Sequence, residues 1–234
     1  MECIVLAGGL GTRLQGVIGN YPKCMAEIAG KPFLYYLFKY LQSQPISRVI
    51  LSLGHKHQII TDWLNTYTWN FTIDTVIESE PLGTGGGLRL ALSEAKEKNV
   101  IALNGDTYFP IDLKKFISFH TEVNAYTSLA LKPMKDFDRY GVVLLNEQYR
   151  IIGFEEKKYR NDGLINGGIY CLNKMAFLQL TENLQKFSFE KDYLETHFPT
   201  NPFYGYITHD YFIDIGIPQD YHKAQQELAY FCNQ

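Results

Sequence analysis

An arginine and a lysine follow a glycine-rich turn near the start of the chain, in "VLAGGLGTRLQGVIGNYPKCM" (5–25). Gly8, Gly9 and Gly11 allow main-chain N–H groups to approach a ligand closely, because glycine has no Cβ. Arg13 carries a planar, forked cation that suits phosphate oxygens. On the glycines alone, a tight strand-to-helix turn with an exposed arginine is an equal alternative. The segment is neither a Walker A loop, since no Gly-Lys-Ser/Thr follows, nor the G-x-G-x-x-G dinucleotide fingerprint, whose spacing fails.

Two aspartates lie at the ends of apolar runs far apart in the chain. Asp106 follows "VIALNG" (100–105), and Asp214 follows "YFI" (211–213). A carboxylate at the end of a strand can hold a hard cation such as Mg²⁺, whereas an isolated aspartate is often a helix cap or turn residue. Two such residues give the metal and the turn interpretations equal weight, and only proximity in space can separate them.

A second glycine-rich segment, "VIESEPLGTGGGLRLAL" (76–92), precedes an expected helix. It is interpreted either as a mobile connection or as a ligand lid and base pocket. Glu78 and Glu80 stand just before it as hydrogen-bond acceptors.

Composition narrows the classes of function. The chain has 234 residues, 46% apolar and 20% charged, with a formal net charge of −3. Duplex-binding proteins normally carry a basic excess, so no nucleic-acid partner is expected. No apolar stretch reaches the length of a membrane span and no basic leader precedes the first apolar run, so neither a membrane partner nor a signal peptide is expected. The cysteines lack metal-ligand spacing and are predicted to be reduced thiols of a cytoplasmic protein: Cys3, Cys24, Cys171 and Cys232.

Alternating strand and helix patterns predict the fold. Strands are expected at 3–7, 48–53, 71–77 and 100–104, with helices at 32–44, 57–67 and 86–98 between them. This βαβα order predicts a doubly wound, Rossmann-like α/β sheet with helices on both faces. After residue 125 the pattern adds strands at 125–133, 140–146, 150–157 and 164–173, and helices at 174–180, 189–198 and 218–231. We therefore expect one α/β domain over residues 1–234 with a mixed, mostly parallel sheet, and ligands beyond the carboxyl ends of its strands.

These motifs, in this order, resemble the sugar-1-phosphate nucleotidyltransferases over nearly the whole chain. The matching segments are Leu6–Leu14, Pro22–Lys23, Leu82–Thr84, Gly105–Asp106, Glu156–Lys157, Ile165–Gly168 and Asp214–Pro218. Many relatives carry R-P-L-T where this chain has "QGVI" (15–18). The loop length is kept, so we interpret this as a subfamily difference. The resemblance implies a glycosyltransferase-A-like nucleotidyltransferase fold, with nucleotide bound by the N-terminal half and sugar phosphate by the C-terminal half.

The family resemblance also implies which residues act. Arg13 would hold the β- and γ-phosphates of the nucleotide, and Lys23 would neutralise the α-phosphate. Lys157 would bind the phosphate of the sugar. Asp106 and Asp214 would share Mg²⁺, the expected cofactor. No side-chain nucleophile is needed, because the sugar phosphate supplies the attacking oxygen.

The remaining contacts implied by the resemblance fall into two groups. The nucleotide-binding group is Leu6, Ala7, Gly8, Gly9, Gly11, Thr12, Glu78, Glu80, Gly83, Thr84, Asn104 and Gly105. The sugar-phosphate group is Gly141, Glu156, Lys157, Asn166 and Gly168. Asn166 is almost equally well interpreted as a turn residue. Glu190 and Asp192, in "FEKDYLETHF" (189–198), are further candidate acceptors in a pocket wall.

The choice of base is expected to depend on Glu78. Relatives that use uridine or thymidine nucleotides have a glutamine at this position, before the Leu-Gly-x loop. A carboxylate with two acceptor oxygens suits the adjacent N1–H and N2–H donors of guanine, which favours GTP. The alternative is that Glu78 and Glu80 both face solvent.

Further segments resemble the heptose 1-phosphate guanylyltransferase branch of the family, which makes GDP-heptose for bacterial surface polysaccharide. They are "GKPFLYYLFKYL", "EPLGTGGGLRLAL", "LALKP", "LINGGIYCLN", "FSFEKDYLE" and "FIDIGIPQDY". This implies GTP and a sugar 1-phosphate as substrates. Mannose or another hexose 1-phosphate is the alternative acceptor, and a catalytically silent, nucleotide-sugar-binding regulatory subunit is the alternative class. A homo-oligomer such as a dimer is one candidate assembly.

Overall fold

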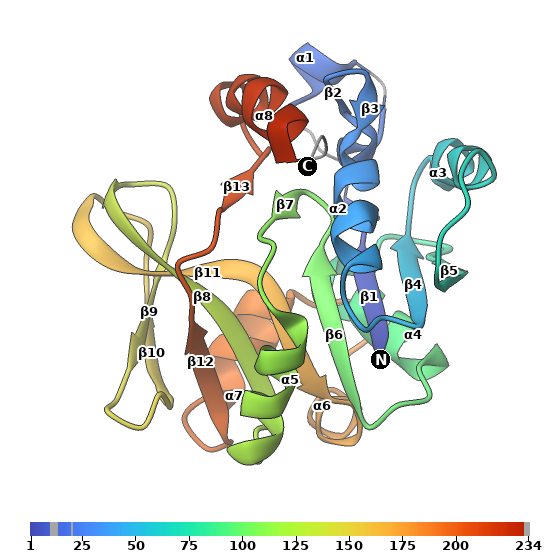
Figure 1. Ribbon diagram of the computed structural model, residues 1–234. Coiled ribbons are helices and arrows are strands. Elements are labelled where there is room, and N and C mark those ends of the chain that lie inside the picture. The colour runs from blue at the N-terminus through green and yellow to red at the C-terminus, as the bar shows by residue number, and fades with distance from the viewer. Residues whose placement is uncertain (10–13, 20, 232–234) are drawn as a thin grey trace.

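A nine-stranded mixed sheet forms the centre of the computed structural model, which describes residues 1–9, 14–19 and 21–231 (Figure 1). The strand order is β10-β9-β11-β6-β1-β4-β5, with β8 paired to β11 and β12 paired to β8. The nine strands are β1 (Glu2–Leu6), β4 (Arg48–Leu53), β5 (Thr72–Ile77), β6 (Asn99–Asn104), β8 (Thr127–Phe137), β9 (Val142–Leu145), β10 (Ile151–Glu155), β11 (Arg160–Asn173) and β12 (Phe203–Ile207). Two small ladders pair β2 (Glu27–Ile28) with β3 (Lys31–Pro32), and β7 (Thr107–Tyr108) with β13 (Ile213–Asp214).

Helices cover the sheet. They are α1 (Gln15–Ile18), α2 (Phe33–Gln42), α3 (His57–Leu64), α4 (Gly83–Glu94), α5 (Leu113–Glu122), α6 (Lys174–Leu180), α7 (Glu195–His197) and α8 (Pro218–Phe231). A 3₁₀ turn, η2 (Lys23–Met25), and a π-helix, η3 (Phe189–Leu194), complete the list. Helix starts follow local capping: Asp112 and Asn173 accept main-chain N–H bonds at the first turns of α5 and α6.

Strand β1 packs on both faces, which explains its uninterrupted apolar sequence. Cys3 and Val5 belong to a core with residues of α2, α5 and α8, whereas Ile4 points into a second core with residues of α4, α6 and η3. All three side chains are fully buried. Burial of a side chain of this size contributes about 1.5–3 kcal/mol, so both faces of the sheet contribute to stability.

The carboxyl ends of three parallel strands converge at one edge. Leu6 of β1 lies in register with Ser52 of β4 and with Asn104 of β6. Strand β11 then runs antiparallel to β6 and leads into the second half of the sheet. Residues that follow Leu6 and Asn104 are therefore neighbours, as the α/β pattern predicts.

Several elements differ from the sequence-based expectation, including helix α1 and the two small ladders, which were not predicted. Helix α4 begins at Gly83, three residues before the expected start at residue 86, so Gly83 and Gly85, which were expected in the loop, lie inside the helix. Helix α5 and strand β12 were not predicted, although β12 extends the sheet by pairing in parallel with β8.

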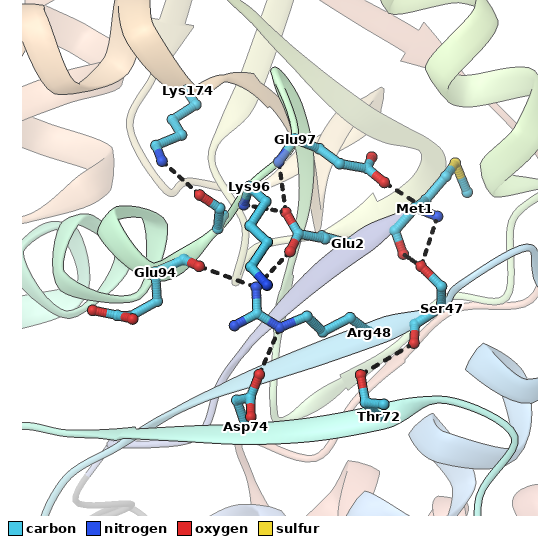
Figure 2. A network of polar contacts seen from close by, with 11 residues as sticks. Met1, Glu2, Ser47, Arg48, Thr72, Asp74, Glu94, Lys96, Glu97 and Lys174 are labelled. Carbon is cyan, nitrogen blue, oxygen red and sulfur yellow. Dashed lines mark hydrogen bonds and ion pairs between the residues drawn. The ribbon is translucent and has the colours of Figure 1, made fainter.

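At the amino-terminal ends of β1 and β4, a polar network around Glu2 connects neighbouring strands (Figure 2). The carboxylate is almost fully buried and accepts bonds from Arg48 Nη1 (2.5 Å) and from the N–H groups of Lys96 (2.5 Å) and Glu97 (2.7 Å). Burial raises the pKa of Glu2, but these hydrogen bonds outweigh it and leave the pKa below its ordinary value. Arg48 also reaches the exposed Asp74. This network ties β1, β4 and β5 together at the end remote from the converging strand termini.

Candidate active site

Two cavities open at the edge where the strand ends converge. One has a volume of about 540 Å³ and the other about 470 Å³. Asn104, Asp106 and Glu190 line both of them. Each is large enough for a small molecule. The shared wall means that ligands in the two cavities would meet beside Asp106.

The larger cavity is built from the ends of β1, β4 and β6 and the start of α4. Its lining includes most of the residues predicted to bind nucleotide: Leu6, Ala7, Gly8, Gly9, Glu78, Gly83, Thr84, Asn104 and Gly105, together with Lys23. Gly105 shows why a glycine is required here, since a Cβ at this position would lie 2.6 Å from the Leu6 carbonyl oxygen. Glu80 is exposed and is not among the described residues that line the cavity. Gly11, Thr12 and Arg13 lie outside the described residues.

Lys23 and the two aspartates come together where the cavities join. Lys23 Nζ lies 2.5 Å from Asp106 Oδ2 and 3.5 Å from Asp214 Oδ1. The β7–β13 ladder places the carboxylates side by side by pairing Asp214 with Thr107, and the Ile215 N–H donates to the Asp106 carbonyl (3.0 Å). The structure therefore brings together the two aspartates, which sequence alone could not show to be neighbours.

Electrostatics at this point favour a cation. Burial raises the pKa of Asp214, and the neighbouring Asp106 raises it further, while Lys23 and the Gly216 N–H partly offset these effects. The Lys23 ammonium thus lies within ion-pair distance of both carboxylates, Asp106 and Asp214. Asp106 and Asp214 suit Mg²⁺, which typically takes one or two carboxylates and completes its shell with water and substrate phosphates. Within the described ranges, no cluster of three or more His, Cys, Asp or Glu side chains could hold a metal by itself.

Glu78 is held in a slot beside the start of α4. The Leu82 N–H donates to Glu78 Oε2 (3.0 Å). A Cβ on Gly87 would lie 2.4 Å from Glu78 Oε1, and a Cβ on Gly8 would lie 3.2 Å from it. The half-buried carboxylate lines the larger cavity, so for Glu78 the solvent-facing alternative is wrong.

The smaller cavity is lined by every residue predicted to contact the sugar phosphate: Gly141, Glu156, Lys157, Asn166 and Gly168. The turn interpretation of Asn166 is confirmed, because its Oδ1 accepts from the Gly168 N–H (3.0 Å), while its Nδ2 donates to the hydroxyl of Tyr170 (2.9 Å); its contact with a sugar stays a prediction. Gly168 has φ +72°, a backbone conformation that favours glycine. The turn therefore orients a polar side chain into the cavity wall.

Sequence reasoning missed several lining residues. They are Ser52, Pro81, Thr107, Tyr140, Phe154, Tyr170, Ser188, Lys191, Glu195 and Phe212. Tyr170 and Phe154 lie in strands that were expected, so their alternation with neighbouring residues was the available signal. Ser52, Lys191 and Glu195 also lie in segments expected to be a strand or a helix, but only the folded chain shows that they line the cavities.

Buried thiols do not contribute a nucleophile. Cys3, Cys24 and Cys171 are buried and unbridged, and Cys232 lies outside the described residues. Cys24 lines the larger cavity, but burial, together with Asp106, raises the pKa of its thiol to about 12. It is therefore protonated and inert at neutral pH.

In the part of the chain that the structure describes, no helix has the length and apolar character needed to span a bilayer.

Comparisons with known proteins agree with this geometry. The Nucleotidyl transferase family model matches residues 2–230. The D-glycero-α-D-manno-heptose 1-phosphate guanylyltransferase of Aneurinibacillus thermoaerophilus is 49% identical over 99% of this chain and 100% of its own length. The corresponding protein of Campylobacter jejuni is 45% identical over 95% of this chain and 97% of its own. The crystal structure of HddC from Yersinia pseudotuberculosis, complexed with GMP-PN, has a TM-score of 0.86 and 41% identity, covering 97% of this chain and 98% of that one.

The match to this family extends over almost the entire chain, and the solved structure has the same α/β architecture, which confirms the predicted fold class. The sequence motifs, the converging strand ends and the family model all agree. The chain belongs to the nucleotidyl transferase family, and it is a nucleotidyltransferase.

Proposed function

We propose that the enzyme transfers GMP from GTP to D-glycero-α-D-manno-heptose 1-phosphate, giving GDP-heptose and pyrophosphate. The observation that carries the proposal is the convergence of Lys23, Asp106 and Asp214 at the junction of two cavities. Two relatives at 49% and 45% identity are named for this reaction, and HddC was solved with a guanine nucleotide analogue.

The proposed chemistry needs no covalent enzyme intermediate. An oxygen of the sugar phosphate forms a bond to the α-phosphorus of GTP, and the bond from that phosphorus to the β-bridging oxygen breaks. The electron pair of the broken bond leaves with pyrophosphate. All reacting groups are anionic, so catalysis consists of in-line positioning and charge stabilisation.

Each cation has a proposed task. Lys23 moves its ammonium to the α-phosphate as charge builds in the transition state, and Lys157 holds the sugar phosphate. Arg13 is proposed to bind the β- and γ-phosphates with the adjacent glycine-rich backbone. Asp106 and Asp214 are proposed to hold Mg²⁺, which when bound supplies neutralising charge to the phosphates.

The two halves of the chain are proposed to bind one substrate each. Most residues of the larger cavity precede residue 107, with Glu190 and Gly216 as exceptions, and the smaller cavity is formed by residues 104–214. Glu78 is proposed to accept from N1–H and N2–H of guanine, since the Leu82 N–H orients its carboxylate. We place the reaction in the cytoplasm, where the product would serve the synthesis of a bacterial capsule, S-layer or lipopolysaccharide.

A pyrophosphate-release assay with Mg²⁺ tests the proposal. The four common nucleoside triphosphates are each paired with heptose 1-phosphate and with mannose 1-phosphate. GTP with heptose 1-phosphate is expected to give the highest kcat/KM. Preference for mannose 1-phosphate would establish the alternative acceptor, and no turnover with any pair would favour a silent regulatory subunit.

A variant tests the base assignment separately. Glu78→Gln is expected to lower kcat/KM for GTP more than for UTP, because a carboxamide suits the single N3–H and carbonyl of a pyrimidine. Equal losses with both nucleotides would remove Glu78 from base selection.

A further inference from the structure

The wall between the two cavities carries a carboxylate to which the reaction chemistry gives no role. Glu190 lies in the π-helix η3, is half-buried and lines both cavities. Among the described residues it forms no ion pair. Instead, the hydroxyls of Thr84 (3.2 Å) and Ser188 (3.3 Å) both donate to its Oε2.

The two hydroxyls are themselves fixed in direction. Thr84 Oγ1 accepts from the N–H of Phe189 (2.9 Å), and Ser188 Oγ accepts from the N–H of Lys191 (3.2 Å). Their protons are therefore available for Glu190 Oε2. Within the described part of the chain, Oε1 has no hydrogen-bond partner. The carboxylate is thus preorganised with one acceptor oxygen left for a ligand.

The glycine run of α4 makes this position possible. The N–H of Phe187 donates to the Leu82 carbonyl (3.0 Å), and the N–H of Gly85 donates to the Phe187 carbonyl (3.0 Å). A Cβ on Gly85 would lie 2.2 Å from the Phe187 ring, and one on Gly86 would lie 2.6 Å from the Gln185 carbonyl oxygen. The segment that precedes Glu190 therefore packs directly on the helix backbone. π-Helices are rare, and they occur frequently at functional sites.

Asp192 serves a different purpose. Its Oδ2 accepts from the N–H of Ser188 (2.7 Å), so it closes the first turn of the π-helix, and the side chain is exposed. The structure thus separates the two acceptors that the sequence grouped together, since only Glu190 reaches the cavities.

A hydroxyl donor lies beside Glu190 on the same wall. The Tyr170 hydroxyl accepts from the side-chain amide of Asn166 (2.9 Å), which leaves its own proton for another partner. Burial raises the pKa of Tyr170, and the charge of Glu190 raises it further, so the two groups are electrostatic neighbours. A donor and an acceptor side by side suit a hydroxyl group, which can both give and accept a hydrogen bond.

We propose that Glu190 is a specificity-determining residue whose free oxygen accepts a hydrogen bond from a sugar hydroxyl of a bound substrate. Both substrates can supply this chemistry, through the ribose of the nucleotide or through the acceptor sugar. The proposal rests on the proposed function, because that function puts a sugar on either side of the wall.

Paired substrates with and without one hydroxyl test the proposal and distinguish the two sources. In the first arm, calorimetry measures the affinity of wild type and Glu190→Ala for GTP, 2′-deoxy-GTP and 3′-deoxy-GTP. In the second arm, kcat and KM are measured with heptose 1-phosphate and its monodeoxy analogues. Glu190→Gln is run in parallel, because its amide oxygen can still accept from Thr84 and Ser188 and so preserves the fold of the wall. Glu182→Ala, an exposed carboxylate on the preceding turn, is the control.

Loss of a hydrogen bond to a charged group is expected to weaken binding about 10- to 100-fold. That loss should appear with the hydroxylated ligand of one pair and vanish with the analogue that lacks the partner hydroxyl. Glu190→Gln should also lose this discrimination, because its only oxygen stays on Thr84 and Ser188 and its NH₂ group replaces the free acceptor, and Glu182→Ala should match wild type. Equal losses for every pair in both arms, or none in either, would overturn the proposal. If wild type prefers another nucleotide or sugar, the proposed function fails, and the same pairs built on the preferred substrates still test Glu190.

Discussion

Replacement of Lys23 by methionine should produce two opposite effects, on metal binding and on catalysis. The Lys23 ammonium lies 2.5 Å from Asp106 Oδ2 and 3.5 Å from Asp214 Oδ1. A divalent cation that enters alone must displace it from both carboxylates. In the variant that competitor is absent, while the side chain keeps a similar length.

The magnitude follows from the contact that is broken. A hydrogen bond between charged groups contributes about 1.5–3 kcal/mol, and each 1.4 kcal/mol is a factor of ten in affinity. Both carboxylates are about one-third exposed, so solvent screening places the effect near the lower end. We therefore expect Lys23→Met to bind Mn²⁺ about tenfold more tightly than wild type without nucleotide. Its kcat/KM should nevertheless fall by about 10²–10³, because a preorganised charge on the transition state is lost.

Calorimetric titration with Mn²⁺ measures the first effect, and pyrophosphate release measures the second. Burial and Asp106 already raise the pKa of Asp214, and loss of Lys23 raises it further, so the titration is run at pH 8 to keep the carboxylate ionised. Lys39→Met, which removes an exposed lysine from α2, is the matched control. Unchanged or weaker Mn²⁺ binding by Lys23→Met would refute competition between the lysine and the metal.

Three further predictions concern other parts of the molecule. Gly87→Ala places a Cβ 2.4 Å from Glu78 Oε1, so it should shift that carboxylate and lower kcat/KM for GTP about tenfold, with a smaller loss for UTP. Glu2→Gln should lower the free energy of unfolding by about 2–3 kcal/mol in urea titrations without changing KM, because charge-assisted bonds are lost far from the site. Burial, with a smaller effect of Lys98, lowers the pKa of His120 to about 4 from an ordinary 6.5. Between these values the unfolded chain binds more protons, so stability should fall by about 2 kcal/mol from pH 7 to pH 5, and His120→Asn should flatten this dependence.

Each of these predictions has a matched control. Ser93→Ala changes an exposed position of α4 and should leave nucleotide preference unaltered. Asp74→Asn removes the exposed partner of Arg48 and should cost less than about 1 kcal/mol, as surface ion pairs do. His222→Asn, at an exposed histidine, should keep the wild-type pH dependence of unfolding. A control that behaves like its test variant would contradict the corresponding assignment.

The parallel half of the fold was predictable because its signals are local. The apolar runs of β1, β4 and β6 and the helical pattern of α2 follow directly from burial on both faces or on one. The end of β6 correctly marked Asp106 as a residue at the site edge. Helix α5 also carries readable local signals, with Asp112 as its N-cap and Phe116 and His120 on its buried face.

The start of α4 could not be predicted from propensity. Glycine disfavours helices by about 1 kcal/mol per residue relative to alanine, so a run of glycines predicts a loop. Here Phe187 and Gln185 pack so closely on Gly85 and Gly86 that any larger residue would clash. Tertiary packing outweighs propensity at this helix, and the partner segment lies about a hundred residues away in the sequence. The sequence marked both Glu190 and Asp192 as candidate acceptors but could not separate them, because the position of Glu190 beside the cavities depends on that packing.

Assembly of the proposed metal site depends on contacts between distant segments. Asp214 reaches Asp106 through the two-residue β7–β13 ladder and the bond from the Ile215 N–H to the Asp106 carbonyl. Lys23 reaches both from the 3₁₀ turn η2 near the start of the chain. Helix α8 contacts β2, and Tyr221 and Gln225 donate to the Glu27 carbonyl, so the same helix ties the last part of the chain to the segment that follows Lys23. Lys23, Asp106 and Asp214 therefore come together only when the C-terminal segment is docked. Weakening the contact between α8 and β2 should consequently reduce catalysis before it unfolds the sheet.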